Sequence, residues 1–415
     1  MTLRIGILGT RGIPNHYGGF EQFAEYLSTG LVAKGHEVFV YNSHNHPYQQ
    51  REWKNVQLIH CYDPEYQLGS FGQFIYDFNC ILDARRRKFD VILMLGFTSS
   101  SAWGWFYPNQ SALIFNMDGL EWKRTKYSKP VQQFLKLAEK MAVRFSNYYI
   151  ADSVVIQSYL QNKYAITSEH IPYGAEIFYN EEESLLQEYG VKKHEYFILM
   201  ARMAAENNIE MILDGFHAST SYKKFLVVGS VENKLGKHLV QKFKHDQRIQ
   251  FTGGIYNSPQ KIHSLKLYSN LYFHGHSVGG TNPSLLEAMA SRSLIAAHDN
   301  PFNRSVLQKD ALYFSAEQQV TAIIENAVRD GSEASFINNN LQKIKDQFSW
   351  ENVIKKYEDF IQRCALKKAD ELNRERVVAD PERSLPDYWR AEGLPGAFSY
   401  CLVPTAHCLF LKSNC

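Results

Sequence analysis

The sequence has few of the features that mark metal-binding, secreted or nucleic-acid-binding proteins. Its six cysteines include no Cys-x-x-Cys pair, so neither a zinc site nor a disulfide framework is expected. The formal net charge of its 415 residues is only +2, and no arginine-rich run alternates with aromatic residues, so no nucleic-acid partner is expected. Residues 1–9 hold no long apolar segment, so we expect no secretory signal and take the cytoplasm as the default location.

Charge is also missing from residues 91–117, which raises the question of a membrane span. Gly96, a run of serines and Pro108 divide this stretch into pieces shorter than the roughly 20 apolar residues that a bilayer requires. We therefore predict two buried strands here, at 91–95 and 112–116, and no membrane span.

What the sequence does contain is a regular alternation of short apolar runs and helical patterns in both halves. This alternation predicts an α/β fold with two doubly wound, Rossmann-like domains facing a central cleft. A charged, turn-rich segment at residues 179–195 is the expected connection between them. The expected strands are 3–8, 37–41, 91–95, 112–116, 197–201, 225–229, 249–252, 271–274 and 294–297, and the first helix is expected at 21–34.

The most informative segment is residues 274–290, where a strand pattern passes through two glycines into a helix. Gly279 and Gly280 allow backbone N–H groups to approach a ligand closely. Asn282 is a good N-cap and Pro283 suits the first helical position. Free N–H groups and the positive end of the helix dipole then favour a phosphate or diphosphate.

One turn into the same helix lies Glu287, whose carboxylate can accept hydrogen bonds from sugar hydroxyls. The segment resembles the donor-site signature of glycosyltransferase family 4, whose GT-B members carry two glutamates eight positions apart. Glu287 and the following Ala-Met match the second glutamate, and Gly279 stands in place of the first. The run Gly-Gly-Thr-Asn-Pro-Ser-Leu-Leu-Glu is more similar to the bacterial rhamnosyltransferase subgroup than to the family at large.

This resemblance covers residues 1–367 and implies a division of the chain into four parts. The parts are an acceptor-side domain at 1–180, a nucleotide-sugar domain at 181–348, a closing helix at 349–367 that returns to the first domain, and a tail at 368–415. The tail is dense in charge at first and then loses any clear period, so we expect it to be weakly ordered or foreign.

A second glycine loop follows the first strand, at residues 9–21. Its spacing would permit a dinucleotide site, but residues 41–43 lack the acidic residue that NAD binding requires. The loop resembles the family's N-terminal glycine loop, which implies that Gly18 and Gly19 approach the donor diphosphate. Arg11 either adds a positive charge there or forms a structural salt bridge.

Arg202 follows a buried strand and precedes a helix, a position from which a guanidinium can bind a diphosphate through two hydrogen bonds. The family pattern continues with Glu-Lys-Asn. Glu206 and Asn208 match it, whereas Asn207 replaces the lysine. The missing cation is worth about 1.5–3 kcal/mol as a charged hydrogen bond. Either Arg202 and backbone amides suffice, or another basic residue compensates.

Asp118, His276 and the turn at residues 251–256 complete the candidate site. Asp118 either orients a donor or acceptor hydroxyl or forms an Asp-Gly turn. The turn resembles the family's base-binding turn, which implies contacts from Gly254 and Tyr256 to a pyrimidine. His276 either touches sugar or phosphate or only packs. No metal is expected, because the sequence has no Asp-x-Asp motif.

Positive charge is concentrated between Lys123 and Arg144, which hold seven basic residues and one acidic residue. At about 1 kcal/mol per basic residue near an anionic leaflet, this excess would hold the protein on the inner face of the cell membrane. A solvated helix face is the alternative interpretation.

The resemblance implies a retaining, metal-independent hexosyltransferase that needs no cofactor. It would transfer L-rhamnose from dTDP-L-rhamnose to a polyprenyl-linked saccharide in bacterial surface polysaccharide synthesis. A GT-B nucleotide-sugar 2-epimerase and a non-catalytic nucleotide-sugar-binding protein are the alternatives. The expected catalytic residues are Arg202, Asp118 and His276, and the expected donor-binding residues are Gly18, Gly19, Arg11, Gly254, Tyr256, Gly279, Gly280, Thr281, Asn282 and Glu287.

Overall fold

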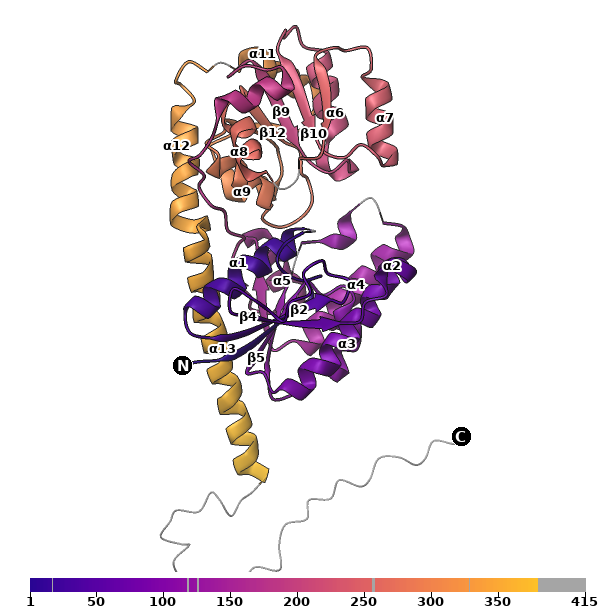
Figure 1. Ribbon diagram of the computed structural model, residues 1–415, viewed down its shortest axis with the longest axis vertical. Coiled ribbons are helices and arrows are strands. Elements are labelled where there is room, and N and C mark those ends of the chain that lie inside the picture. Colours follow the sequence, from indigo (N-terminus) through magenta and orange to yellow (C-terminus); the bar gives the residue numbers. More distant parts are fainter. Residues whose placement is uncertain (17, 118, 125–126, 256–257, 328, 380–415) are drawn as a thin grey trace, which may run out of the picture. The chain divides into compact units, whose positions relative to one another are not determined.

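The computed structural model describes residues 1–16, 18–117, 119–124, 127–255, 258–327 and 329–379. The chain divides into a compact unit of residues 1–368 and a second unit that begins at Ala369. Two β-sheets and the candidate site lie in the first unit (Figure 1). We call the first sheet with its helices the first lobe, and the second sheet with its helices the second lobe.

The elements alternate between strand and helix along most of the chain. The strands are β1 Arg4–Leu8, β2 Glu37–Ser43, β3 Glu52–Trp53, β4 Val56–Cys61, β5 Val91–Leu95, β6 Ala112–Asn116, β7 Tyr148–Ala151, β8 Glu169–His170, β9 Tyr196–Met200, β10 Lys224–Val228, β11 Ile249–Gly253, β12 Leu271–His274, β13 Ile295–His298 and β14 Leu312–Phe314. The α-helices are α1 Gly19–Ala33, α2 Glu65–Leu68, α3 Gly72–Arg87, α4 Lys129–Phe145, α5 Val154–Tyr164, α6 Ile209–His217, α7 Lys234–Lys242, α8 Pro259–Leu267, α9 Pro283–Ala290, α10 Pro301–Leu307, α11 Glu317–Asn326, α12 Ala334–Lys343 and α13 Trp350–Ala379. Shorter helical turns are η1 Gly69–Phe71, η2 Ser100–Phe106, η3 Glu121–Lys123, η4 Glu183–Tyr189, η5 Ala205–Asn207 and η6 Ile344–Phe348.

Both sheets of the described chain are doubly wound. The first has the strand order β3-β4-β2-β1-β5-β6-β7-β8, and the second has the order β11-β10-β9-β12-β13-β14. The edge pair of β3 and β4 is antiparallel, and the central strands pair in parallel. The predicted α/β class with two Rossmann-like sheets is therefore confirmed.

Strands β5 and β6 show why the sheets are parallel. Their residues are almost uninterruptedly apolar and are buried, as is usual for strands that are covered by helices on both faces. Their pairing places Val91 beside Ala112. The two strands predicted within residues 91–117 are thus confirmed. Among the helices that the structure describes, none is both long and apolar enough to cross a membrane.

Helix α13 packs against α1 of the first lobe, where Trp350 stacks on Tyr26 with ring centroids 4.4 Å apart. The closing helix expected at residues 349–367 forms the first part of α13, which continues to Ala379. Residues 368–379 contain neither proline nor glycine, so nothing in their sequence ends the helix at the expected boundary.

Strands β3, β4, β7, β8 and β14 are not predicted from the sequence. Strands β3, β7, β8 and β14 have only four residues or fewer, and polar residues interrupt the apolar pattern of β4. Such short segments join a sheet because neighbouring strands offer free backbone partners, and this tertiary effect is not visible in local periodicity.

The order of each sheet reverses at one central strand, and this reversal positions the loops of the candidate site. The first sheet reverses at β1, between β2 and β5, and the second reverses at β9, between β10 and β12. Doubly wound folds bind ligands outside the carboxyl ends of their strands at such points. The loops in question are residues 9–18 after β1, residues 201–204 after β9 and residues 275–282 after β12.

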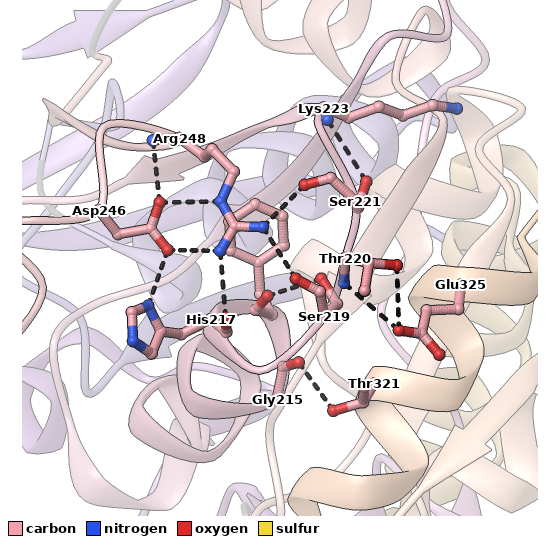
Figure 2. Close-up of polar contacts among 11 residues, drawn as sticks. Gly215, His217, Ser219, Thr220, Ser221, Lys223, Asp246, Arg248, Thr321 and Glu325 are labelled. Atoms are coloured by element: carbon pink, nitrogen blue, oxygen red, sulfur yellow. Dashed lines mark hydrogen bonds and ion pairs between the residues drawn. The ribbon is translucent and has the colours of Figure 1, made fainter.

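Figure 2 shows a polar cluster of the second lobe in which one arginine uses all of its N–H groups. Arg248 donates from Nε and Nη2 to the two carboxylate oxygens of Asp246, at 2.9 and 2.6 Å. Its Nη1 donates to the carbonyls of Ser219 and Ser221, and Nη2 also donates to that of His217. These carbonyls lie at and beyond the end of α6, where helical donors run out. The Arg248 cluster therefore closes that helix end.

Candidate functional site

Three cavities open near the carboxyl ends of the central strands, and Arg202 lines all of them. The glycine cavity has a volume of about 240 Å³ and is lined by the start of α1, by first-lobe residues that follow β6, β7 and β8, and by the loops after β9 and β12. The Glu287 cavity, about 520 Å³, lies in the second lobe. The first-lobe cavity, about 330 Å³, lies beside the ends of β1 and β5. A ligand that occupied all three cavities would pass Arg202.

Both lobes form the glycine cavity. The first lobe contributes Gly19, Phe20, Arg124, Asp152 and Tyr173, and the second contributes Arg202, His276 and residues 278–283. Two arginines, one histidine and the start of helix α9 thus face one space. This combination of positive charge and free N–H groups suits an anion.

The start of α9 has the predicted geometry. The Asn282 side chain accepts a hydrogen bond of 2.9 Å from the backbone N–H of Ser284, which confirms the expected N-cap. Gly279 has a φ of +138°, a conformation that side chains rarely adopt. A Cβ atom on Gly280 would lie 2.0 Å from both carboxylate oxygens of Asp152. Glycine is therefore required at both positions, for conformation at the first and for close approach at the second.

The glycine loop of the first lobe reaches the same place. Gly18 is the N-cap of α1 in extended conformation, and Gly19 begins that helix and lines the glycine cavity. A Cβ atom on Gly19 would come within 4.0 Å of the Pro283 ring. Across the same boundary, the Thr281 hydroxyl donates to the backbone carbonyl of Asp152. The structure thus brings together the two glycine loops that the sequence identifies.

Arg202 is exposed, and its guanidinium makes no hydrogen bond or ion pair with the residues that the structure describes. The motif that follows it holds the loops in place. Asn207 is buried, and its side chain donates to the Arg202 carbonyl at 2.7 Å, while the Asn208 side chain donates to the Gly275 carbonyl at 2.8 Å. The position that carries a lysine in the family pattern is therefore structural in this chain and presents no charge to the cavity.

A second arginine, Arg124, lines both the glycine cavity and the first-lobe cavity. Its Nη2 lies 2.6 Å from Glu121, and its Nη1 lies 3.5 Å from Glu206 of the second lobe. Arg124 was predicted only as part of the basic segment and not as a site residue. The one available signal was its place just after a strand-end loop, six residues from Asp118.

His276 also faces the glycine cavity. Burial, together with the positive charges of Arg124 and Arg202, lowers its pKa to about 3. The imidazole is therefore neutral at physiological pH, and its ring stacks on that of His274 with centroids 4.7 Å apart. Across the described residues, no group of three or more His, Cys, Asp or Glu side chains is placed to hold a metal ion.

Glu287 lines the second-lobe cavity that bears its name, next to Ser284. Burial opposes its ionisation, but the ammonium of Lys266, 2.9 Å away, holds the pKa of Glu287 below its usual range. Lys266 is almost fully buried on α8 and lines the same cavity, yet it is not among the predicted site residues. The signal was present, since Lys266 follows Leu265 and lies four residues after Ile262 on the apolar side of that helix.

The remaining predicted residues fall into separate places. Arg11 forms a two-pronged ion pair with Glu65, at 2.8 and 2.7 Å, and lines the first-lobe cavity, so the structural salt bridge is what the geometry shows. Gly254 lines the Glu287 cavity. Asp118 and Tyr256 lie outside the described residues, and their roles stay predictions.

The basic segment follows helix α4. The solvent-exposed basic residues of this helix are Lys129, Lys136, Lys140 and Arg144. Two apolar side chains of the same helix are also exposed, Val131 and Leu137, and Trp105 of the neighbouring η2 is 69% exposed. Positive charge and apolar side chains therefore occur together on this part of the first lobe.

Comparison with known families divides the chain in the same way as its two sheets. Residues 181–343 match the family described as glycosyl transferases group 1. Residues 3–176 match a domain of unknown function, DUF1972. No curated protein sequence matches the chain significantly.

Solved structures share the fold at low sequence identity. Sucrose-phosphate synthase from Thermosynechococcus elongatus has a TM-score of 0.73 and 16% identity, over 87% of this chain and 98% of that one. HepE from Anabaena, in complex with UDP and glucose, has a TM-score of 0.69 and 15% identity, over 87% and 100%. The α,α-trehalose 6-phosphate synthase from Burkholderia multivorans has a TM-score of 0.68 and 9% identity, over 90% and 98%. The likeness shows that two Rossmann-like sheets are arranged here as in GT-B enzymes.

Proposed function

We propose that the chain, whose residues 181–343 match the glycosyl transferases group 1 family, is a retaining glycosyltransferase that uses a nucleoside-diphosphate sugar. The observation that carries this proposal is Arg202, whose exposed guanidinium has no protein partner among the described residues and lines all three cavities. HepE, which has the same fold, was solved with UDP and glucose and supports a nucleotide-sugar donor.

Each cavity suits one part of the reactants. The glycine cavity would hold the diphosphate between Arg202 and the start of α9. The Glu287 cavity would hold the nucleoside, with ribose hydroxyls donating to Glu287 and the base beside Gly254 and Ile255. The first-lobe cavity, lined by polar and aromatic side chains, is left for the acceptor.

The proposed chemistry needs no protein nucleophile. The bond between the anomeric carbon and the diphosphate oxygen breaks, and the acceptor oxygen forms a new bond to that carbon on the same face. The acceptor proton passes to the leaving phosphate oxygen. Negative charge develops on the diphosphate in this step, and the Arg202 guanidinium and the backbone N–H groups at α9 stabilise it. Fixed positive groups thereby supply the stabilisation for which other transferases use a metal ion.

For the donor sugar we propose L-rhamnose carried by dTDP, on the strength of the Gly-Gly-Thr-Asn-Pro-Ser-Leu-Leu-Glu segment and its resemblance to rhamnosyltransferases. Position 279 supports a donor different from that of the family at large. A Cβ atom there would meet nothing within 4 Å, so replacing the first glutamate by glycine leaves open space beside the diphosphate site.

For the acceptor we propose a polyprenyl-linked saccharide at the inner face of the membrane. The exposed basic residues of α4, next to Leu137 and Trp105, are a suitable docking surface. Reversal of Lys129, Lys136 and Lys140 to glutamate should release the protein from anionic vesicles and leave transfer to a short soluble acceptor unchanged. Equal co-sedimentation of parent and variant would contradict membrane docking through α4.

The direct test is an assay of purified protein with a panel of donors that includes dTDP-L-rhamnose and UDP-glucose, with chelator present. Transfer of rhamnose with retention at the anomeric carbon supports the proposal. Conversion of the donor to its 2-epimer without any acceptor would instead identify an epimerase. Tight donor binding without turnover on any acceptor would identify a non-catalytic binding protein.

A further inference from the structure

Arg124 and Arg202 both line the glycine cavity, and the two residues come from different lobes. Arg124 follows η3 of the first lobe, and Arg202 follows β9 of the second. Their charges act on one common neighbour, since both depress the protonation of His276. The Arg124 side chain is only 19% exposed, so it is held in position rather than extended into solvent.

The ion pairs of Arg124 leave part of its guanidinium unused. Nη2 of Arg124 forms an ion pair with one carboxylate oxygen of Glu121 at 2.6 Å. The contact from Nη1 to Glu206 is 3.5 Å long, at the limit of a hydrogen bond. Nε of Arg124 and the second carboxylate oxygen of Glu206 are buried without hydrogen-bond partners among the residues described. Buried polar groups of this kind are uncommon and mark a place where a further partner belongs.

Position 207 explains why a second cation is needed here. Asn207 is buried and donates to the carbonyl of Arg202, so it offers no charge to the cavity. We propose that Arg124 replaces that cation and binds the donor diphosphate from the first lobe, facing Arg202. This inference rests on the proposed function, since it assigns a residue to the same donor site.

In the free protein, Glu206 then occupies the position near Arg124 that the diphosphate would take. Its carboxylate lies across the lobe boundary from Arg124, at a distance that permits attraction but only a poor hydrogen bond. A diphosphate carries more negative charge and more acceptor oxygens, so it would take up the unused N–H groups of Arg124. Binding of the donor would in this way fix the position of the first lobe relative to the leaving group.

The test is calorimetric titration of the full chain with dTDP, UDP and thymidine. Arg124→Ala should weaken diphosphate binding by about 10- to 100-fold, the scale of a lost charged hydrogen bond, and should leave thymidine binding within about twofold. Arg124→Lys should fall between parent and Arg124→Ala. Lys123→Ala is the matched control, because Lys123 is adjacent and exposed but lines neither cavity, and it should bind like the parent.

Glu206→Gln separates ligand binding from a purely structural bridge. If Arg124 binds the diphosphate, this variant should bind dTDP as tightly as the parent or more tightly, because a competing negative charge is gone. If Arg124 only ties the lobes together through Glu206, this variant should lose affinity as Arg124→Ala does, and the proposal is overturned. Equal diphosphate affinity of Arg124→Ala and parent would overturn it as well. Failure of the parent itself to bind either diphosphate would overturn the proposed function, and this inference with it.

Discussion

Two arginines of the second lobe, Arg248 and Arg202, differ in how their guanidinium groups are used. Each of the five N–H groups of Arg248 has an acceptor. Three of these acceptors are backbone carbonyls at and beyond the C-terminal end of α6. Arg202 is exposed beside three cavities and has no protein acceptor in the described part of the chain. An arginine with satisfied donors stabilises the fold, whereas one with free donors in a cavity is available to a ligand.

The largest effect is expected for Arg202→Ala. Removal of one charge-stabilising donor from a developing anion should lower kcat by about 10²–10³. The thermal midpoint should change by less than about a degree, because the Arg202 side chain makes no hydrogen bond or ion pair with the described residues, and alanine keeps the backbone carbonyl that accepts from Asn207. Steady-state kinetics and differential scanning fluorimetry on the same sample check both parts. A kcat within threefold of the parent would remove Arg202 from the leaving-group role.

Arg248→Ala should show the reverse pattern. It leaves three carbonyls at the end of α6 without their donor, and it removes the main ion-pair partner of Asp246. Because the group is about a quarter exposed, we expect a loss of about 2–3 kcal/mol in stability, with kcat unchanged at temperatures where the variant is folded. Substitution by lysine should recover only part of this loss. A variant that unfolds like the parent would show that the cluster is dispensable.

Glu287 should combine both patterns, because its carboxylate has a structural partner and faces a cavity. Glu287→Gln keeps an acceptor for Lys266 and should weaken dTDP or UDP binding about tenfold through the ribose contact, a loss of about 1.4 kcal/mol. Glu287→Ala should in addition lower the melting temperature of the free protein, because it leaves the Lys266 ammonium buried and unpaired. Equal nucleotide affinity of parent and Glu287→Gln would contradict the proposed hydrogen bonds between Glu287 and the ribose hydroxyls.

The smallest effect is a change in protonation at His276. Burial and the two cleft arginines hold its pKa at about 3, so the pH–rate profile should show no step near 6.5 from this residue. Removal of a nearby positive charge favours the imidazolium, so the pKa should rise in Arg202→Ala. A bound diphosphate should raise it in the same direction. Titration of the His276 ring signals by NMR measures both shifts, and a normal histidine pKa in the parent would contradict this environment.

Features that depend on residues close together in the sequence were predicted well. The capped start of α9, the two glycine loops and Arg202 at the end of β9 all follow from local patterns and from the rule that parallel strands end at one edge. The uncharged stretch that became β5 and β6 is of the same kind.

Features that depend on distant residues were missed. Arg124 faces Glu206 only because β6 and β9 belong to sheets whose loops meet at one cavity, and no periodicity in the sequence indicates that pairing. Lys266 reaches Glu287 by the packing of α8 on α9, and Arg11 is bound by Glu65, a residue outside any motif. The sequence therefore shows which residues are charged, but it does not show which partners their side chains meet in the fold.

The most direct test of the account is a crystal structure of the protein with dTDP or UDP bound. The account predicts the diphosphate in the glycine cavity, with a phosphate oxygen at about 2.7–2.9 Å from the Arg202 guanidinium and the ribose within hydrogen-bond reach of Glu287. A nucleotide bound elsewhere, with the Arg202 guanidinium still free of any acceptor, would contradict the claim that this arginine holds the leaving group.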